Sequence, residues 1–395
     1  MIHRSEAQST LTPSDIDALR SEEFPWTLRG DTAYLNHAGT GPLPERAIDV
    51  LAQWNRWRAE PWRVTDRDAV LPGLAHVRTL CASLIGAKPT EIALVPNTSF
   101  GLNVAARALP LDPGDVVLVS DGEFPAVIYA WRAVEETRGI RLRVLPTRDG
   151  LLDEVALLAA LDAGDVRAVT VSWVSFATGY RVDLARLGAA CRLRGIYFVV
   201  DAVQGLGPAQ LDIRTCHADI VACGAHKWLL SPWGTGFLYV REDLIPRLAP
   251  PIVGWFIGPR SEDYAQMLHY DFQHFADARR FEVMTMPSHD FMAMGRSLEL
   301  LLELSPQAVE RRVRALTDHM VAWALDRADI KLVTPADSCR RAGIVALAPR
   351  DPIASSERLR AAGVIHSLRE GAIRFAPYFY NTTEEVQRAL ALLHE

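Results

Sequence analysis

Short runs of apolar, mostly β-branched residues alternate with amphipathic stretches from about Glu91 to Val240. Seven of these runs are predicted to be strands, at 92–95, 115–120, 140–145, 166–173, 195–202, 218–223 and 236–240. Helices are predicted between several of them, for example at 125–139 and 184–195. Continuous apolar strands joined by crossover helices are typical of a doubly wound, mostly parallel α/β domain, whose ligands bind outside the carboxyl ends of the strands.

The pattern changes after Val240, where proline and aromatic residues crowd positions 246–260 and an irregular stretch is expected up to about residue 290. The later elements are predicted as a long helical region at 290–327, strands at 344–347, 364–368 and 372–376, and helices near 354–362 and from 383. A chain of 395 residues also exceeds the roughly 250–300 residues at which single cores stop growing. We therefore predict a large ligand-binding domain at 31–260 and a smaller α+β domain made of 1–30 and 261–395.

Composition and charge exclude several classes of protein. The net charge is −6 and no run is rich in lysine or arginine, so neither nucleic acid nor a membrane surface is expected as a partner. No secretory leader and no run of about 18 apolar residues is visible, which favours a cytoplasmic protein. The five scattered cysteines favour a reduced compartment over a disulfide framework, and none has zinc-site spacing, so no metal is expected.

Lys227 has an unusual setting for a lysine. It follows an apolar strand in DIVACGAHKWLLSPWGTGFLYV, between His226 and Trp228 and ahead of a glycine-rich return. A lysine in an apolar pocket has a depressed pKa and can react as a neutral amine. On this window alone, a partly buried structural lysine is the more frequent explanation.

Two further segments point to a cofactor. Asp201 ends the most apolar strand, in VVDAVQGLG, where an unpaired carboxylate is costly and a pyridinium N–H would be a suitable partner. Gln204 follows three residues later and could reach the phenolic oxygen of the same ring. Thr98 and Ser99 open a helix in PNTSFGLN, where free amides and two hydroxyls would cradle a phosphate. Taken singly, each segment is also compatible with simple helix capping.

The order of these motifs resembles the class V aminotransferase and cysteine desulfurase family of fold-type I enzymes that use pyridoxal 5′-phosphate (PLP). The resemblance runs from YLNHAGTGPLP (34–44) to YFYNTTEEV (378–386), and it is closest to isopenicillin-N-epimerase-like and desulfurase-like members. It implies a fold-type I PLP-dependent enzyme with the cofactor held as an imine on Lys227. It also implies a homodimer with shared active sites, since the family counterpart of Thr285 reaches the phosphate of the neighbouring subunit.

The resemblance assigns roles by position. Lys227, Asp201 and His226 are the expected catalytic residues, and Arg374 is expected to grip the substrate carboxylate, with His37 as a second substrate contact. The expected cofactor contacts are Thr98, Ser99, Phe124, Ser175, Asp201, Gln204, Gly224, His226, Lys227 and Thr285. Phe124 replaces a ring-stacking histidine, and Gly224 stands where many relatives have a phosphate-binding serine. Either Ser175 or Phe176 stands where an asparagine often contacts the ring oxygen.

The C-terminal motif bears on the reaction. In HSLREGAIRF only four residues separate Arg369 from Arg374, and the desulfurase loop with its nucleophilic cysteine is missing; Cys339 is interpreted as an incidental thiol. A lyase or epimerase-like reaction at the α-carbon of an amino acid is therefore expected. The alternatives are a class V aminotransferase, a desulfurase with a relocated cysteine, and an inactive PLP-fold binding protein. An NAD-binding Rossmann protein is excluded because no G-x-G-x-x-G follows the first strand.

Overall fold

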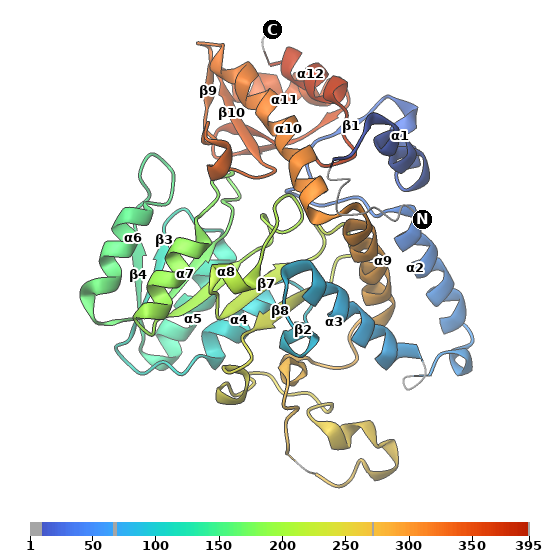
Figure 1. Cartoon of the computed structure of the whole chain (residues 1–395), viewed down its shortest axis with the longest axis vertical. Helices are drawn as coiled ribbons and strands as arrows, with labels where there is room; N and C mark the ends of the chain where they lie inside the picture. The colour runs from blue at the N-terminus through green and yellow to red at the C-terminus, as the bar shows by residue number, and fades with distance from the viewer. Residues whose placement is uncertain (1–9, 66–68, 271, 394–395) are drawn as a thin grey trace.

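The computed structural model describes residues 10–65, 69–270 and 272–393, and a seven-stranded sheet lies at its centre (Figure 1). Its strands in sequence order are β2 (Ile92–Leu94), β3 (Val116–Ser120), β4 (Arg141–Leu145), β5 (Val166–Ser172), β6 (Tyr197–Asp201), β7 (Ile220–Gly224) and β8 (Gly236–Val240). The spatial order is β2-β8-β7-β6-β5-β3-β4, and β8 runs antiparallel to both neighbours. The five strands from β7 to β4 pair in parallel, as the continuous apolar runs predicted.

Helices cover both faces of this sheet, because its strands are apolar on both sides. On β3, Val117 and Val119 contribute to one buried cluster, while Val116 and Leu118 contribute to the other. The first cluster is covered by α4 (Thr98–Ala108) and α5 (Pro125–Arg138). The second is covered by α3 (Leu71–Ile85), α6 (Glu154–Ala160), α7 (Leu184–Leu193), α8 (Ile213–Cys216) and α9 (Ser288–Leu304).

The C-terminal part forms a second, antiparallel sheet with the order β12-β13-β10-β9. Its elements are α10 (Pro306–Leu325), β9 (Ile330–Leu332), β10 (Val345–Pro349), α11 (Pro352–Ala361), β11 (Val364–Ile365), β12 (Ser367–Arg369), β13 (Ala372–Phe375) and α12 (Thr383–Ala391). The helical region predicted at 290–327 is two helices, because Ser305 adopts φ 71° directly before Pro306. A residue that precedes proline is disfavoured in the α conformation, which ends α9 at this point.

The N-terminal segment connects the two sheets. It contains α1 (Pro13–Glu22), β1 (Ala33–Tyr34) and α2 (Glu45–Arg58), and β1 pairs in parallel with β11 of the C-terminal part. Helix α9 packs on α2 and α3, beside the large sheet (Figure 1). The division into 31–260 and 1–30 with 261–395 stays a prediction. Among the described residues, no helix combines the length and the apolar character that a membrane span requires.

Candidate active site

A cavity of about 350 Å³ lies at the carboxyl ends of the large sheet, facing β12 and β13 of the small sheet. It brings together eight of the residues predicted from the sequence: Thr98, Ser99, Phe124, Asp201, Gln204, His226, Lys227 and Arg374. Its other lining residues are Ala38, Gly39, Asn97, Ala126, Phe176, Val203 and Arg369. The cavity therefore lies where ligands bind in doubly wound sheets, at the carboxyl ends of parallel strands.

Lys227 lies in the turn between β7 and β8, and its amine points into the cavity. Burial lowers the pKa of this amine; the charge of Asp201 opposes the shift, and that of Arg374 adds to it. The Nζ atom lies 5.8 Å from the centre of the Phe124 ring. Behind the lysine, Gly41 approaches so closely that an added Cβ would lie 2.0 Å from the Lys227 carbonyl oxygen. The chain thus holds a partly desolvated amine on a tightly packed backbone, as a nucleophilic lysine requires.

Asp201 is the last residue of β6, and its side chain is 3% exposed. One carboxylate oxygen accepts a hydrogen bond from the Val203 amide at 2.9 Å. Burial raises the pKa of Asp201 to about 6, against the opposing effects of that hydrogen bond and of the Lys227 charge. A carboxylate that is this poorly solvated gains most from a cationic partner in the cavity.

The N-terminus of α4 forms the opposite end of the cavity. Asn97 caps the helix by accepting the Phe100 amide at 2.8 Å, and the amides of Thr98 and Ser99 start the first turn, where no intrahelical partner exists. These amides, the two hydroxyls and the helix dipole make an anion site. The Thr98 hydroxyl accepts the Gly224 amide at 2.8 Å.

Gly224 itself does not line the cavity, and its predicted cofactor contact stays a prediction. An added Cβ would lie 3.1 Å from Thr98 Oγ1 and 3.2 Å from His226 Nδ1, so a serine here would crowd both neighbours. Gly224 contributes to the site through its backbone amide, which donates a hydrogen bond to the Thr98 hydroxyl. Glycine therefore permits the close approach of β7 to the start of α4.

Two aromatic rings form one wall of the cavity. Phe124 caps α5 and meets Phe176 edge to face, with ring centres 5.3 Å apart. Ser175 does not face the cavity, because its hydroxyl accepts the Thr178 amide at 3.2 Å within its own turn and lines a small neighbouring cavity. Phe176 therefore replaces Ser175 as the residue that this turn presents to a ligand.

Gln204 is held by two hydrogen bonds, and His226 has a lowered pKa. The Gln204 amide donates to the Ala38 carbonyl and accepts from the Trp228 indole, both at 2.9 Å, which orders the 38–39 segment along the cavity. Burial lowers the pKa of His226 to about 4, with a smaller contribution from the Lys227 charge. His226 is thus neutral at pH 7 and can hydrogen-bond without adding charge.

Arg374, on β13, is 2% exposed and is oriented by two contacts. Its Nε donates to the Ser367 hydroxyl at 3.0 Å, and one terminal nitrogen donates to the Phe176 carbonyl at 2.7 Å. Burial lowers the pKa of the guanidinium to about 10, and the charge of Arg369 adds to this effect. A cation fixed in this way can bind a carboxylate with little further loss of side-chain freedom.

His37 does not line the cavity, and its predicted substrate contact stays a prediction. It is fully buried, with Nδ1 2.9 Å from the Ala376 carbonyl and Nε2 2.7 Å from the Tyr380 hydroxyl. A carbonyl only accepts, so Nδ1 carries the hydrogen and Nε2 accepts from the tyrosine. Burial lowers the pKa of His37 to about 3, and the neutral ring joins the N-terminal segment to the chain after β13.

Thr285 also lies outside this cavity. It is exposed in the segment before α9 and has φ 65°, an unusual conformation for a β-branched residue. Its predicted contact with a neighbouring subunit's phosphate stays a prediction.

The comparisons with known proteins agree with this geometry. The profile described as Aminotransferase class-V matches residues 33–389. The chain belongs to the class V aminotransferase family. Isopenicillin N epimerase of Streptomyces clavuligerus is 30% identical over 368 residues, which cover 90% of this chain and 92% of that protein. A probable cysteine desulfurase of Methanothermobacter thermautotrophicus is 27% identical, over 90% of this chain and 92% of its own length.

Solved structures confirm the fold class of this family member. A mutant of C-DES, described with glycine covalently linked to its PLP cofactor, superimposes with a TM-score of 0.85 at 22% identity, over 95% of this chain and 99% of that chain. The expected fold-type I architecture is therefore confirmed, and family membership confirms the expectation of a PLP enzyme.

The cavity of this class V enzyme fits PLP on its own chemistry. The anion site at α4 suits the phosphate, the Phe124 wall suits a flat ring, and the buried Asp201 needs a cation such as a protonated ring nitrogen. Lys227 would supply the amine that holds the cofactor. These groups lie around one space, as their order along the sequence predicted.

Glu123, which the sequence did not single out, lines a small cavity next to this class V site. Its carboxylate accepts the Ser172 amide at 2.9 and 3.0 Å, together with the Ser172 hydroxyl. Burial raises the pKa of Glu123 to about 7, the hydrogen bonds from Ser172 oppose this, and the Asp201 charge adds to it. Ser172 pairs in register with Asp201, so Glu123 joins the segment bearing Phe124 to the strand end beside Asp201. Its only signal in the sequence is its place before Phe124, which a solvated acid could equally occupy.

Proposed function

We propose that this PLP enzyme acts at the α-carbon of an amino acid and catalyses a lyase or epimerase-like reaction. The observation that carries the proposal is the placement of a desolvated lysine and an oriented arginine, Lys227 and Arg374, around one cavity without a thiol. Among the described residues that line it, none is a cysteine. Cys339 is exposed and lines a separate cleft with Trp173 and Arg181, so a persulfide relay has no nucleophile in the cavity.

The residues divide the task between binding and proton transfer. Bound PLP would supply an electron sink for the α-carbon. Arg374 would bind the substrate carboxylate and so set which α-bond faces the lysine. Lys227, as a neutral amine, would accept the α-proton on Nζ, while the Asp201 carboxylate remains charged. Phe124 and Phe176 would keep water from that side of the cavity, which strengthens the electrostatic interactions inside it.

The reaction type is tested with an amino-acid panel and product analysis. Ammonia with a keto acid would identify a lyase, and the opposite stereoisomer would identify an epimerase. Pyridoxamine phosphate would instead identify an aminotransferase, and alanine with a persulfide on Cys339 would identify a desulfurase. Borohydride reduction should fix the cofactor on Lys227, whereas attachment to another lysine, or to none, would contradict the proposal. A protein that retains the cofactor but turns over no amino acid would be the inactive binding protein.

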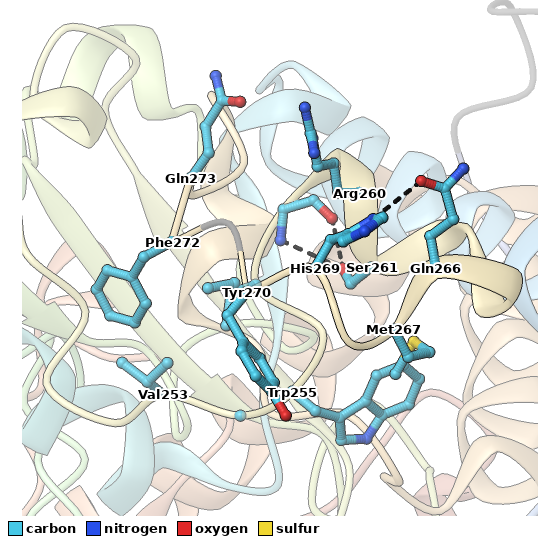
Figure 2. Close-up of a pocket in the computed structure, with 13 residues that line it drawn as sticks. Val253, Trp255, Arg260, Ser261, Gln266, Met267, His269, Tyr270, Phe272 and Gln273 are labelled. Carbon is cyan, nitrogen blue, oxygen red and sulfur yellow. Dashed lines mark hydrogen bonds between the residues drawn. The ribbon is translucent and has the colours of Figure 1, made fainter.

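We also propose that the enzyme is a homodimer with shared sites. An arm made of residues 250–270 and 272–275 extends from the large sheet (Figure 1). Its exposed apolar side chains are Ile252, Val253, Trp255, Tyr264, Met267, Leu268, Tyr270 and Phe272. Figure 2 shows Val253, Trp255, Met267 and Tyr270 along one side of a cavity of about 310 Å³ in this arm, with Arg260 and Gln273 on the other side. So much exposed apolar surface is typical of an interface.

A mixture of Thr285→Ala and Lys227→Ala chains tests the shared site, because hybrid dimers should retain the cofactor unequally in their two sites. A monomer with full activity at working dilution would contradict it. The five cysteines are unpaired, which suits a reducing compartment, and the cytoplasmic location stays a prediction.

A further inference from the structure

A second guanidinium lines the active-site cavity beside the one that is expected to bind the substrate carboxylate. Arg369 is the last residue of β12, and both Arg369 and Arg374 line the same space as Lys227. Antiparallel pairing places Ser367 opposite Arg374, and Arg369 opposite Ala372. Arg369 and Arg374 are therefore diagonal neighbours on one face of the small sheet, where Cβ atoms typically lie about 7–8 Å apart.

The two arginines differ in how they are held. Arg374 is buried and oriented by Ser367 and the Phe176 carbonyl, whereas Arg369 is exposed and donates to the carbonyl of its neighbour Leu368 at 2.8 Å. Arg369 forms no ion pair with any carboxylate within residues 10–65, 69–270 and 272–393. Its guanidinium is thus available to a ligand that enters the cavity.

Basic side chains outnumber acidic ones among the described residues that line the cavity. Asp201 is the one carboxylate among the described lining residues, and it is expected to pair with the cofactor ring. The charge of Arg369 contributes to lowering the pKa of both Lys227 and Arg374, so its field reaches the centre of the site. A substrate α-carboxylate would neutralise Arg374 and leave the second guanidinium without a counter-ion.

We propose that the substrate is an amino acid with a carboxylate on its side chain, and that Arg369 binds this second carboxylate while Arg374 holds the first. The inference rests on the proposed function and adds the substrate class. Because Arg369 is exposed, the distal carboxylate would lie toward the mouth of the cavity, which suits a side chain extending outward from the α-carbon. A guanidinium favours a carboxylate over an amide of the same shape, because only the carboxylate forms a charge-assisted pair with it.

The test compares acids with their amides on the purified holoenzyme. Aspartate and asparagine, glutamate and glutamine, and 2-aminoadipate and its amide are measured for kcat/KM, and for Kd from the change in cofactor absorbance. In the wild type the best acid should exceed its amide by roughly ten- to hundredfold. Arg369→Gln should collapse this ratio toward one, and Arg369→Lys should restore part of it. Arg350→Gln removes an exposed arginine outside the cavity and should preserve the ratio.

The outcomes separate this inference from the proposed function. The second-carboxylate site would be overturned if neutral amino acids were turned over in preference to acids. It would also be overturned if Arg369→Gln lowered kcat/KM equally for an acid and its amide. Either result would leave the proposed chemistry at the α-carbon intact. If no amino acid is turned over, the proposed function fails, and the Kd ratios still decide the inference. Equal Kd values for acid and amide in the wild type would refute it.

Discussion

Replacing Glu123 by Gln tests whether a buried carboxyl beside the cofactor site titrates near neutral pH. The side chain accepts the Ser172 amide at 2.9 and 3.0 Å and also accepts the Ser172 hydroxyl. Glutamine preserves this geometry, because its amide oxygen can accept from the Ser172 amide and its NH₂ can donate to the Ser172 hydroxyl. The substitution therefore removes a titrating group without opening a cavity.

The magnitude follows from the shift in the pKa of Glu123. Burial raises this pKa from 4.5 to about 7, so between these values the folded protein binds more protons than the unfolded chain. The free energy of unfolding consequently falls as pH rises through this window. At about 1.4 kcal/mol per pKa unit, the ionised Glu123 costs on the order of 3 kcal/mol of stability by pH 8. The pKa of Asp201, raised to about 6, also makes the free energy of unfolding fall as pH rises, but it does so in both the wild type and Glu123→Gln.

The assay is urea unfolding of the cofactor-free protein at pH 5, 6, 7 and 8, followed by both tryptophan fluorescence and circular dichroism. Coincident transitions are needed before a single free energy of unfolding is assigned. The stability of Glu123→Gln relative to wild type should rise by about 2–3 kcal/mol between pH 5 and pH 8. Glu136→Gln, which removes an exposed carboxylate from α5, the helix that follows Glu123, serves as the matched control. Parallel pH profiles for Glu123→Gln and wild type would refute the reasoning.

Three further substitutions test the support of Lys227, the carboxylate clamp and the absence of a catalytic thiol. Gly41→Ala places a Cβ 2.0 Å from the Lys227 carbonyl oxygen and should reduce the amount of cofactor bound per subunit, measured by absorbance. Gly254→Ala, whose added Cβ has its nearest atom at 3.4 Å, should leave cofactor binding unchanged. Equal cofactor loading of the two variants would contradict the argument. Arg374→Ala should lower kcat/KM by about 2–5 kcal/mol, because it leaves a carboxylate unpaired in the cavity; a change below tenfold would exclude it as the carboxylate clamp. Cys339→Ser should leave turnover nearly unchanged. If the Cys339→Ser variant is inactive and the wild-type protein accumulates a persulfide on Cys339, the enzyme is a desulfurase.

Local signals in the sequence sufficed for the elements with strong periodicity. The seven strands of the large sheet appear as continuous apolar runs because both faces of the sheet are buried. Prediction was weaker where the chain breaks a periodic pattern. Helical spacing continues across Ser305, and only the left-handed conformation before Pro306 shows that two helices are present.

By itself, the sequence determined the cofactor class, which family membership confirms. It also placed Lys227, Asp201 and Thr98 after strands or at the start of a helix, where the ends of these elements meet at one edge of the sheet. Only the tertiary structure decided which nearby side chains face the cavity. Phe176 rather than Ser175 enters it, His37 is buried against Tyr380, and Arg369 lines the cavity beside Arg374. These outcomes depend on contacts between segments far apart in the chain, such as the bond from Arg374 to the Phe176 carbonyl. A periodic pattern tells which face of an element is buried, but the orientation of a turn is set by whatever packs against it.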